Sequence, residues 1–446
     1  MRAGAFCLGL LALSALVTSG CSWSRFDDIT DNSPIVLFEK PGSMKSGFGV
    51  SLGTLTRDGQ SSLLVGGVVG STSGASLYNI GDGESPSTTS SDSAYCSGGN
   101  CYLSSSFGAF ANATSGASRP QCYAVGTGAV GDAGIIVRCL DATEYPLSIP
   151  TAAQRLLTFS LGNQQPYDYP MATDRTSDPV LLVTLPYNHT AWFYPSKSTK
   201  YSELEAPSEA LIDDPSFGDT LTVLTVGDSR VLAVGVPGKS EVLLWRTDGG
   251  AGSSYIGCLG GLPGFGRALG SGNVNRDEVS DLVVSDDINV HVIDGQALSA
   301  LPATDSSECS FASLPGGALL GSFGCGSSSS TSNCEGSAFG AAVAVGDLDG
   351  DGDGEVIVGA PQMTVRDEAG AGAVLVFDAE TAADAAFSEV KFLSSAEGGD
   401  NLGAVLATPH IKGRDLIVAG APGNAKAALF YCSSLLPTGA AGSRCP

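Results

Sequence analysis

The chain has 446 residues, and 60 of them are Gly, nearly twice the usual share of about 7%. Hydrophobic residues make up 43% of the chain, which is enough for a buried core and argues against wholesale disorder. The formal net charge of −24 repels phosphate backbones, so it disfavours nucleic acid as a partner and suits cation binding. With only 3 His, the sequence gives little support to His-based catalysis or to a multi-His zinc site.

The first residues predict export. Met1 and Arg2 are followed by an apolar stretch at residues 3–17. A stretch of this length is typical of a signal peptide and is shorter than a membrane span of about 20 residues. We therefore expect residues 1–20 to be a signal peptide and the mature protein to lie outside the cytoplasm.

The end of this leader resembles the lipobox of bacterial lipoproteins. Small residues precede Cys21, although Thr18 stands where that family favours Leu. The resemblance implies acylation of Cys21 and a tether at residues 21–33, and Ser22 then favours sorting to the outer membrane. We expect an outer-membrane lipoprotein on the periplasmic or surface face; an ordinary signal peptide cut near Gly20, with a secreted product, is the alternative.

One sequence unit recurs along the rest of the chain. It opens with Phe-Gly or a relative, passes a polar turn, and continues with a β-branched run ending in Gly-Ala-Pro or a relative. A second apolar strand closes the unit. The clearest copy begins at Ala338 and contains FGAAVAVGDLDGDGDGEVIVGAP. Further copies open at Phe48, Phe107, Phe217, Phe265 and Leu402, and a weaker one lies between Leu161 and Tyr194, with DPVLLVTLP as its second strand.

The pattern within each unit predicts β-strands. Runs such as VLAVGV and DLIVAGA are short, rich in β-branched residues and bounded by Gly or Pro. Seven units leave about 60 residues each, which is enough for four short strands and their loops. Only residues 379–390 have a pattern compatible with a helical turn, and we expect residues 309–337 to form the longest loop.

The unit resembles the FG-GAP repeat of integrin α-subunit propellers and of many bacterial surface proteins, over roughly residues 33–432. The resemblance implies an all-β fold, a seven-bladed β-propeller at residues 34–446. Six or eight blades are the alternatives, because the copies at Phe107 and Leu161 match poorly. Family precedent makes residues 34–38 (PIVLF) the outer strand of the last blade; an ordinary first strand is the alternative.

Cysteine usage agrees with export. Beyond Cys7 and Cys21, an even number of cysteines remains, which in an oxidising compartment predicts up to five disulfides. Because short loops close readily, we expect local pairs. These are Cys96–Cys101, Cys122–Cys139, Cys325–Cys334 and Cys432–Cys445, which leaves Cys258–Cys309.

One acidic loop carries the strongest chemical motif. Asp347, Asp349, Asp351, Asp353 and Glu355 fall within nine residues, and such a loop repels itself unless a cation neutralises it. Ca²⁺ takes 6–8 oxygen ligands. An EF-hand is disfavoured, because a valine stands at its twelfth position and EVIVGAP has a strand pattern.

The FG-GAP resemblance assigns roles within this loop. It implies that Asp347, Asp349 and Asp351 bind calcium through their side chains and Asp353 through its backbone carbonyl. Glu355 closes the site, where the family usually has Asp. The alternative is a solvated acidic turn.

A second loop has the same spacing with weaker ligands. Its candidate ligands are Asn273, Asn275, Asp277 and Asp281, with Arg276 alongside. A turn that has lost its metal is the alternative.

These features predict a binding protein rather than an enzyme. Calcium is expected to be structural, and His291 is expected to be a packed or exposed strand residue. The predicted function is a surface binding or adhesion module for a protein or glycan ligand. The alternatives are an envelope scaffold protein and a glycan-acting hydrolase that uses carboxylates in the central channel.

Overall fold

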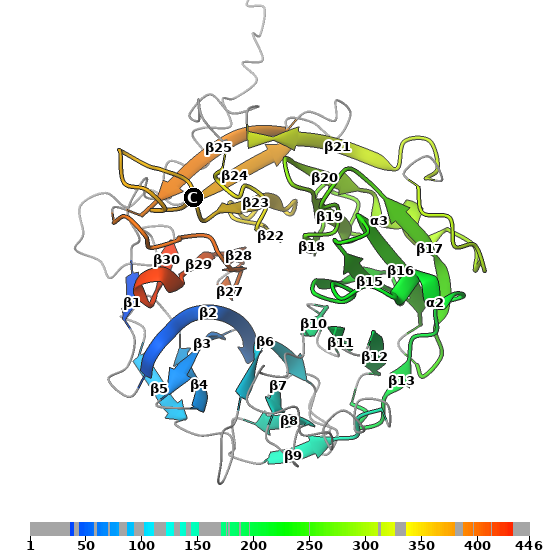
Figure 1. Cartoon of the computed structure of the whole chain (residues 1–446), viewed down its shortest axis with the longest axis horizontal. Helices are drawn as coiled ribbons and strands as arrows, with labels where there is room; N and C mark the ends of the chain where they lie inside the picture. Colours follow the sequence, from blue (N-terminus) through cyan, green and yellow to red (C-terminus); the bar gives the residue numbers. More distant parts are fainter. Residues whose placement is uncertain are drawn as a thin grey trace, which may run out of the picture.

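The strands of the chain close into a ring (Figure 1). The computed structural model describes residues 36–39, 44–57, 60–69, 72–79, 87–92, 102–110, 122–128, 134–139, 144–150, 171–310, 314–325, 336–379, 387–395, 397–411 and 413–430, with short gaps at 175, 177–178, 187–188, 196 and 249. Within these residues, seven four-stranded antiparallel sheets form the blades. The fold is thus an all-β propeller, as expected.

Six blades are each built from four consecutive strands, numbered here along the chain. Blade 1 contains β2 (Met44–Arg57), β3 (Gln60–Val69), β4 (Thr72–Asn79) and β5 (Ser87–Asp92). Blade 2 contains β6 (Tyr102–Phe110), β7 (Cys122–Gly128), β8 (Gly134–Cys139) and β9 (Glu144–Leu147). Blade 3 contains β10 (Met171–Thr173), β11 (Leu181–Leu185), β12 (Thr190–Tyr194) and β13 (Ser202–Glu203).

Blade 4 contains β14 (Leu221–Val226), β15 (Ser229–Val236), β16 (Glu241–Thr247) and β17 (Ser254–Gly260). Blade 5 contains β18 (Ala268–Gly272), β19 (Asp281–Ser285), β20 (Asn289–Ile293) and β21 (Leu319–Gly324). Blade 6 contains β22 (Ala342–Gly346), β23 (Glu355–Ala360), β24 (Ala373–Ala379) and β25 (Phe387–Ser394). Every predicted repeat therefore contributes the start of one blade, including the weak copy whose DPVLLVTLP run contains β11.

The seventh blade joins the two ends of the described chain. It contains β26 (Leu406–Ala407), β29 (Ile417–Ala421), β30 (Lys426–Phe430) and, on its outer edge, β1 (Val36–Glu39). β1 pairs antiparallel with β30, with Val36 opposite Leu429 and Glu39 opposite Lys426. This pairing confirms that the PIVLF run supplies the outer strand of the last blade. A small hairpin of β27 (His410–Ile411) and β28 (Arg414–Asp415) lies between β26 and β29.

The core lies between neighbouring blades. The second strand of a blade is packed on both faces, and β11, β19, β23 and β29 are buried along their whole length. Among the described residues, six of the blade interfaces hold an apolar cluster. In one of them, Val283 and Phe323 of blade 5 pack against Val358 and Phe377 of blade 6. This burial on both faces explains why these strands have continuous β-branched runs rather than alternating patterns.

The Phe-Gly pair that opens a repeat fixes how one blade meets the previous one. Phe339 is 3% exposed, and Gly340 has a φ of +80°. A Cβ on Gly340 would lie 2.9 Å from the Cβ of Ser285 in blade 5, so both the conformation and the space require glycine. The glycines after Phe48, Phe217, Phe265 and Leu402 have φ values of +85°, +80°, +88° and +88°.

Two expectations about secondary structure were wrong. Residues 387–390, at the end of the stretch that had a helical pattern, belong to strand β25 (Phe387–Ser394). The expected long loop at residues 309–337 contains strand β21, whose glycines and exposed Leu319 gave it a weak strand pattern. The described helices are short: α2 (Glu209–Ile212), α3 (Gly295–Ser299) and the 3₁₀ turn η5 (Pro422–Asn424). In the described part of the chain, no helix has the length and hydropathy required to cross a membrane.

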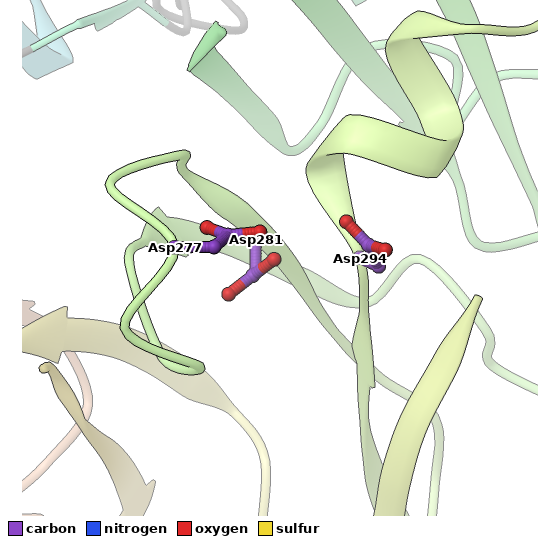
Figure 2. Close-up of side chains that lie close together, drawn as sticks. All are labelled: Asp277, Asp281 and Asp294. Atoms are coloured by element: carbon purple, nitrogen blue, oxygen red, sulfur yellow. The ribbon is translucent and has the colours of Figure 1, made fainter. Parts of the chain in front are cut away.

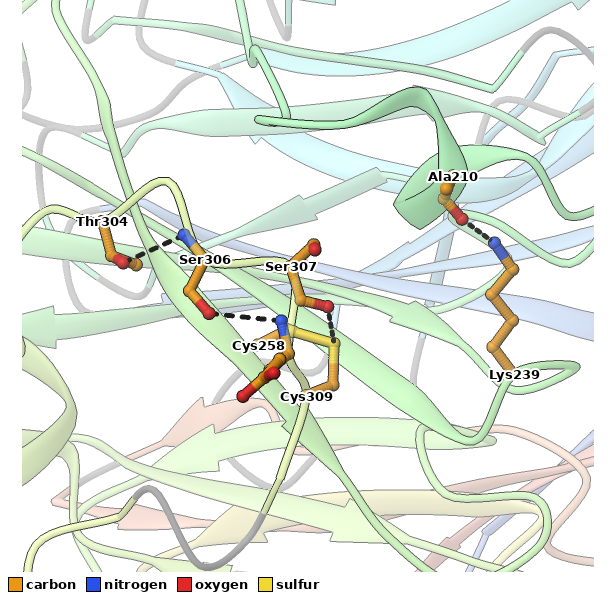
Figure 3. Close-up of a disulfide and its surroundings, with 8 residues drawn as sticks. Ala210, Lys239, Cys258, Thr304, Ser306, Ser307 and Cys309 are labelled. Carbon is orange, nitrogen blue, oxygen red and sulfur yellow. Dashed lines mark hydrogen bonds between the residues drawn. A yellow bond between two sulfur atoms is a disulfide. The ribbon is translucent and has the colours of Figure 1, made fainter.

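Two of the predicted disulfides are confirmed. Cys122 and Cys139 join β7 to β8, and Cys258 on β17 joins Cys309 (Figure 3). The second bridge holds the segment after α3 beside β17, where Thr304 also donates a backbone hydrogen bond to the Tyr255 carbonyl at 3.1 Å. Cys325 is also disulfide-bonded. Its expected partner Cys334, and the other predicted cysteines, Cys96, Cys101, Cys432 and Cys445, lie outside the described residues, as do Cys21 and the leader.

Candidate metal centre

The two acidic loops predicted from the sequence are neighbours in space. Residues 347–354 connect β22 to β23 in blade 6, and residues 273–280 connect β18 to β19 in blade 5. Both are the turn between the first and second strands of a blade. Because these turns lie at the same end of adjacent blades, the ring places them side by side.

Backbone N–H groups curl the 347–355 loop around Asp347. Its Oδ1 accepts hydrogen bonds from the N–H of Gly350 at 2.7 Å and of Asp351 at 3.1 Å, and its Oδ2 accepts one from Gly352 at 3.1 Å. Gly350 and Gly352 have φ values of +80° and +97°, which glycine adopts without strain. The two glycines thus permit the tight curl that turns alternate side chains toward one centre.

The curl gathers the predicted ligands. Carboxylate oxygens of Asp347, Asp349 and Asp351 lie within 4.8 Å of one another, and the same holds for Asp351, Asp353 and Glu355. Asp351 belongs to both groups, so the five acids form one continuous cluster. Burial raises the pKa of Asp347, and the neighbouring carboxylates of Asp349 and Asp415 raise it further.

Glu355 is the buried acid at the end of the loop. It is 1% exposed, and its Oε2 accepts a hydrogen bond from the Leu348 N–H at 2.7 Å. Burial raises its pKa well above the usual value, and nearby Asp349, Asp378 and Asp353 add to this. A buried carboxylate among other carboxylates is costly unless a cation or a proton compensates.

The 273–281 loop repeats this geometry residue by residue. Asp281 is buried, and its Oδ2 accepts from the Val274 N–H at 2.9 Å, as Glu355 does from Leu348. Arg276 and Glu278 have φ values of +63° and +65° at the places held by Gly350 and Gly352. The longer Glu355 therefore accepts the same backbone hydrogen bond in its loop that Asp281 accepts in the other.

A third acid joins the second loop. Figure 2 shows Asp277 and Asp281 on the loop and Asp294 from the end of β20, and their carboxylate oxygens lie within 4.8 Å of one another. Burial raises the pKa of Asp281 to about 7, although hydrogen bonds from Val274 and Gly295 oppose the rise. The Asn273 and Asn275 side-chain oxygens instead accept from the Asp277 N–H, at 3.2 and 3.1 Å. Asp294 was not predicted, because only the fold brings the end of β20 to this loop.

The 347–355 loop is bound to both neighbouring blades. On the blade 5 side, the Gly354 N–H donates to the Asn273 carbonyl at 2.5 Å, and Arg276 pairs with Asp351 and Asp353. On the blade 7 side, the Asp415 N–H donates to the Asp347 carbonyl at 2.6 Å. Arg276 supplies the positive charge that the nearby sequence of this loop lacks.

Comparison with known proteins assigns this region to a family. The profile of the FG-GAP repeat matches residues 339–377, which include the acidic loop and strands β22, β23 and β24 up to Phe377. The chain is a β-propeller that contains an FG-GAP repeat. No curated protein matches the sequence. Among solved structures, virginiamycin B lyase from Staphylococcus aureus is similar, with 10% identity, a TM-score of 0.49, and coverage of 89% of this chain and 99% of that one.

The donor set of the FG-GAP propeller suits a hard cation. The 347–355 loop offers side-chain and backbone oxygens. Ca²⁺ prefers 6–8 oxygen ligands in flexible arrangements. Asp347, Asp349, Asp351 and Glu355 would supply carboxylates, and Asp353 a carbonyl. These oxygen donors would suit calcium, and the second loop offers fewer charged ligands.

His291 joins a serine and an aspartate at a different place in the FG-GAP propeller. Its Nδ1 lies 2.7 Å from Ser322 Oγ, and its Nε2 lies 2.9 Å from Asp286 Oδ2. A cavity of about 550 Å³ nearby is lined by Asp287, Ile288, Asn289 and Gly324 among others, but among the described residues neither His291 nor Ser322 lines it. We interpret the trio as a tie between β20 and β21, in agreement with the expected strand role of His291.

Proposed function

We propose that the FG-GAP propeller is a calcium-stabilised binding module of the cell envelope. The fold supports a protein-interaction module. Beyond that, our proposal is that the chain is exported, is anchored through a lipid on Cys21, and uses its rigid ring for surface binding or adhesion rather than for catalysis. Its ligand would be a protein or a glycan.

The observation that carries the calcium proposal is the clustering around the 347–355 loop. Five acids converge there, and two of them, Asp353 and Glu355, are 6% and 1% exposed. Water can screen an exposed acidic turn, but it screens buried carboxylates poorly. A divalent cation would compensate these charges, and this favours a cation site over the solvated turn that the sequence left open.

The contacts of the loop favour a structural role for the ion. The loop is hydrogen-bonded to Asn273 in blade 5 and to Asp415 in blade 7. An ion that stiffens the loop would therefore stiffen two blade interfaces together. Because such an ion binds the folded state, it would raise the stability of the whole ring.

The disulfides support export. Cys122–Cys139 joins the two middle strands of blade 2, and Cys258–Cys309 joins the outer strand of blade 4 to the segment after α3. Such bonds persist in oxidising compartments outside the cytoplasm. Together with the apolar leader and Cys21, they favour a mature protein in the envelope or outside the cell.

Thermal unfolding of residues 22–446, with calcium and with chelator, tests the calcium proposal. Calcium at about 100 times its Kd would add about 2.7 kcal/mol to the free energy of unfolding, so we expect the Tm to rise by several degrees. Asp349→Ala should lose most of this gain. Asp228→Ala is the matched control, because Asp228 is an exposed acid in the equivalent turn of blade 4.

The same variants test the binding role. Attachment of the purified module to cells or matrix should require calcium and should weaken in Asp349→Ala but not in Asp228→Ala. An unchanged Tm in calcium, with no metal found by elemental analysis, would contradict the calcium proposal. Stable capture of one envelope partner would instead favour the scaffold, and glycan turnover would favour the hydrolase.

A further inference from the structure

Arg276 reaches from blade 5 into the acidic loop of blade 6. Its guanidinium bonds to Asp351 through Nη2, and its Nη2 and Nε lie 2.8 Å from Asp353 Oδ1 and Oδ2. The contact with Asp353 is a bidentate ion pair, the strongest geometry between arginine and a carboxylate. An arginine guanidinium stays protonated in proteins, so this contact is an ion pair.

The backbone around Arg276 holds it in this position. Asn273 of the same loop accepts from the Gly354 N–H through its carbonyl and donates through Nδ2 to the Gly352 carbonyl at 3.1 Å. These bonds fix the register between the two loops. Arg276 has a φ of +63°, the left-handed conformation that Gly350 has at the same place in the neighbouring loop. A non-glycine residue at this position is unusual, and its side chain is directed at the loop beside it.

Both residues that contact Arg276, Asp351 and Asp353, are among the proposed calcium ligands. Asp351 would bind the ion through its side chain, whereas Asp353 would bind through its backbone carbonyl. The side chain of Asp353 can therefore keep the arginine when the ion is bound, but the carboxylate of Asp351 would be contested between two cations. Arg414, on the blade 7 side, instead donates to a backbone carbonyl, that of Asp349, at 3.5 Å.

We propose that Arg276 is a built-in counter-ion that competes with calcium for Asp351 and so sets the calcium affinity of the 347–355 loop. The proposal rests on the proposed calcium site. Arg276 compensates the loop charge when calcium is scarce, and it releases Asp351, while keeping Asp353, when calcium binds. The affinity of the site thus depends on a residue of the adjacent blade.

Calorimetric titration of residues 22–446 with CaCl₂ tests this competition. We expect Arg276→Gln to bind calcium roughly tenfold more tightly, because a neighbouring positive charge is lost. Arg276→Lys keeps the positive charge but not the bidentate geometry. Its calcium affinity should lie between those of wild type and Arg276→Gln. The matched control is Arg267→Gln, which removes an arginine from the other end of β18, where it pairs with Asp287 at 3.7 Å.

A second readout follows the same variants in chelator. There Arg276→Gln should lower the Tm relative to Arg267→Gln, because the acidic loop then loses the positive charge paired with Asp351 and Asp353. Calcium binding by wild type with an equal or weaker affinity in Arg276→Gln would overturn the competition and leave the proposed function standing. No calcium binding by any of the proteins would overturn both.

Discussion

Asp286 shows how this protein holds a buried charge with hydrogen bonds. The side chain has no exposed surface, yet its Oδ1 accepts from the N–H groups of Ile288 and Asn289, at 2.7 and 2.6 Å, and its Oδ2 meets His291. Burial alone would raise its pKa, but these hydrogen bonds outweigh burial and hold the pKa below its usual value. Glu355 and Asp281, by contrast, each accept fewer bonds and face other acids, and the pKa of each is raised.

The lowered pKa of Asp286 predicts a pH-dependent loss of stability. Because its folded pKa lies below the unfolded value of about 3.9, ionised Asp286 stabilises the protein above that pH and loses its contribution as the pH falls through the folded pKa. Asp286→Asn should cost about 2 kcal/mol at pH 7, and the difference from wild type should shrink in acid. Urea unfolding in chelator at pH 7 and pH 3 measures both. A constant difference, or an equal loss in the exposed neighbour Asp287→Asn, would contradict the prediction.

At the scale of the strands, glycines set the distance between blades. A Cβ on Gly359 of β23 would lie 2.0 Å from the carbonyl oxygen of Gly403, which opens blade 7. Gly420 of β29 meets Gly49 of blade 1 in the same way, at 2.2 Å. The Gly of the Gly-Ala-Pro run in one blade thus contacts the Gly of the Phe-Gly pair in the next, which gives a physical reason for both glycines of the repeat.

Gly359→Ala should therefore open the interface between blades 6 and 7. The new methyl group meets backbone rather than a movable side chain, so the free energy of unfolding should fall by about 1–3 kcal/mol. Gly316→Ala is the matched control, because nothing lies within 4 Å of a Cβ there and Gly316 is exposed. Chemical denaturation compares the two. A loss in Gly316→Ala as large as in Gly359→Ala would show that the effect is not one of blade packing.

For the whole molecule, the closing strand turns a row of blades into a ring. β1 completes blade 7, and Phe38 of β1 is 3% exposed in a cluster with Leu429 of β30 and Phe48 of blade 1. The closure lets an early segment hold the last blade, so that each end of the chain stabilises the other. It also places the start of the ring at the outer edge of blade 7, beyond the expected tether at residues 21–33.

Weakening the closure should destabilise the ring more than a surface change does. Phe38→Ala leaves a cavity at the junction of blades 7 and 1 and should lower the free energy of unfolding by about 3–5 kcal/mol. Val50→Ala in blade 1, where the side chain is 41% exposed, should change it by less than about 1 kcal/mol. Both are measured by urea unfolding, and equal losses would argue against a special role for β1.

The repeat made most of the fold predictable from the sequence. Phe48, Phe217, Phe265, Phe339 and Leu402 each precede or begin a blade as expected, because burying a large side chain beside a tight glycine turn is a local requirement of every blade. Strand β21 was missed because it lies at the outer edge of its sheet, where half of its side chains face solvent and no continuous apolar run is needed.

The sequence likewise predicted one part of the candidate metal centre and missed another. The acids Asp347 to Glu355 follow one another in the sequence, so their spacing alone predicted a cation loop. Arg276 and Asp294 come from other parts of blade 5, and Asp415 comes from blade 7; no spacing in the sequence relates them to the acids they meet. The sequence by itself thus determined the repeat, its strands and one acidic loop, since these depend on neighbours along the chain. Only the closed ring decided which charges face that loop, because it brings together turns that lie about 60–80 residues apart.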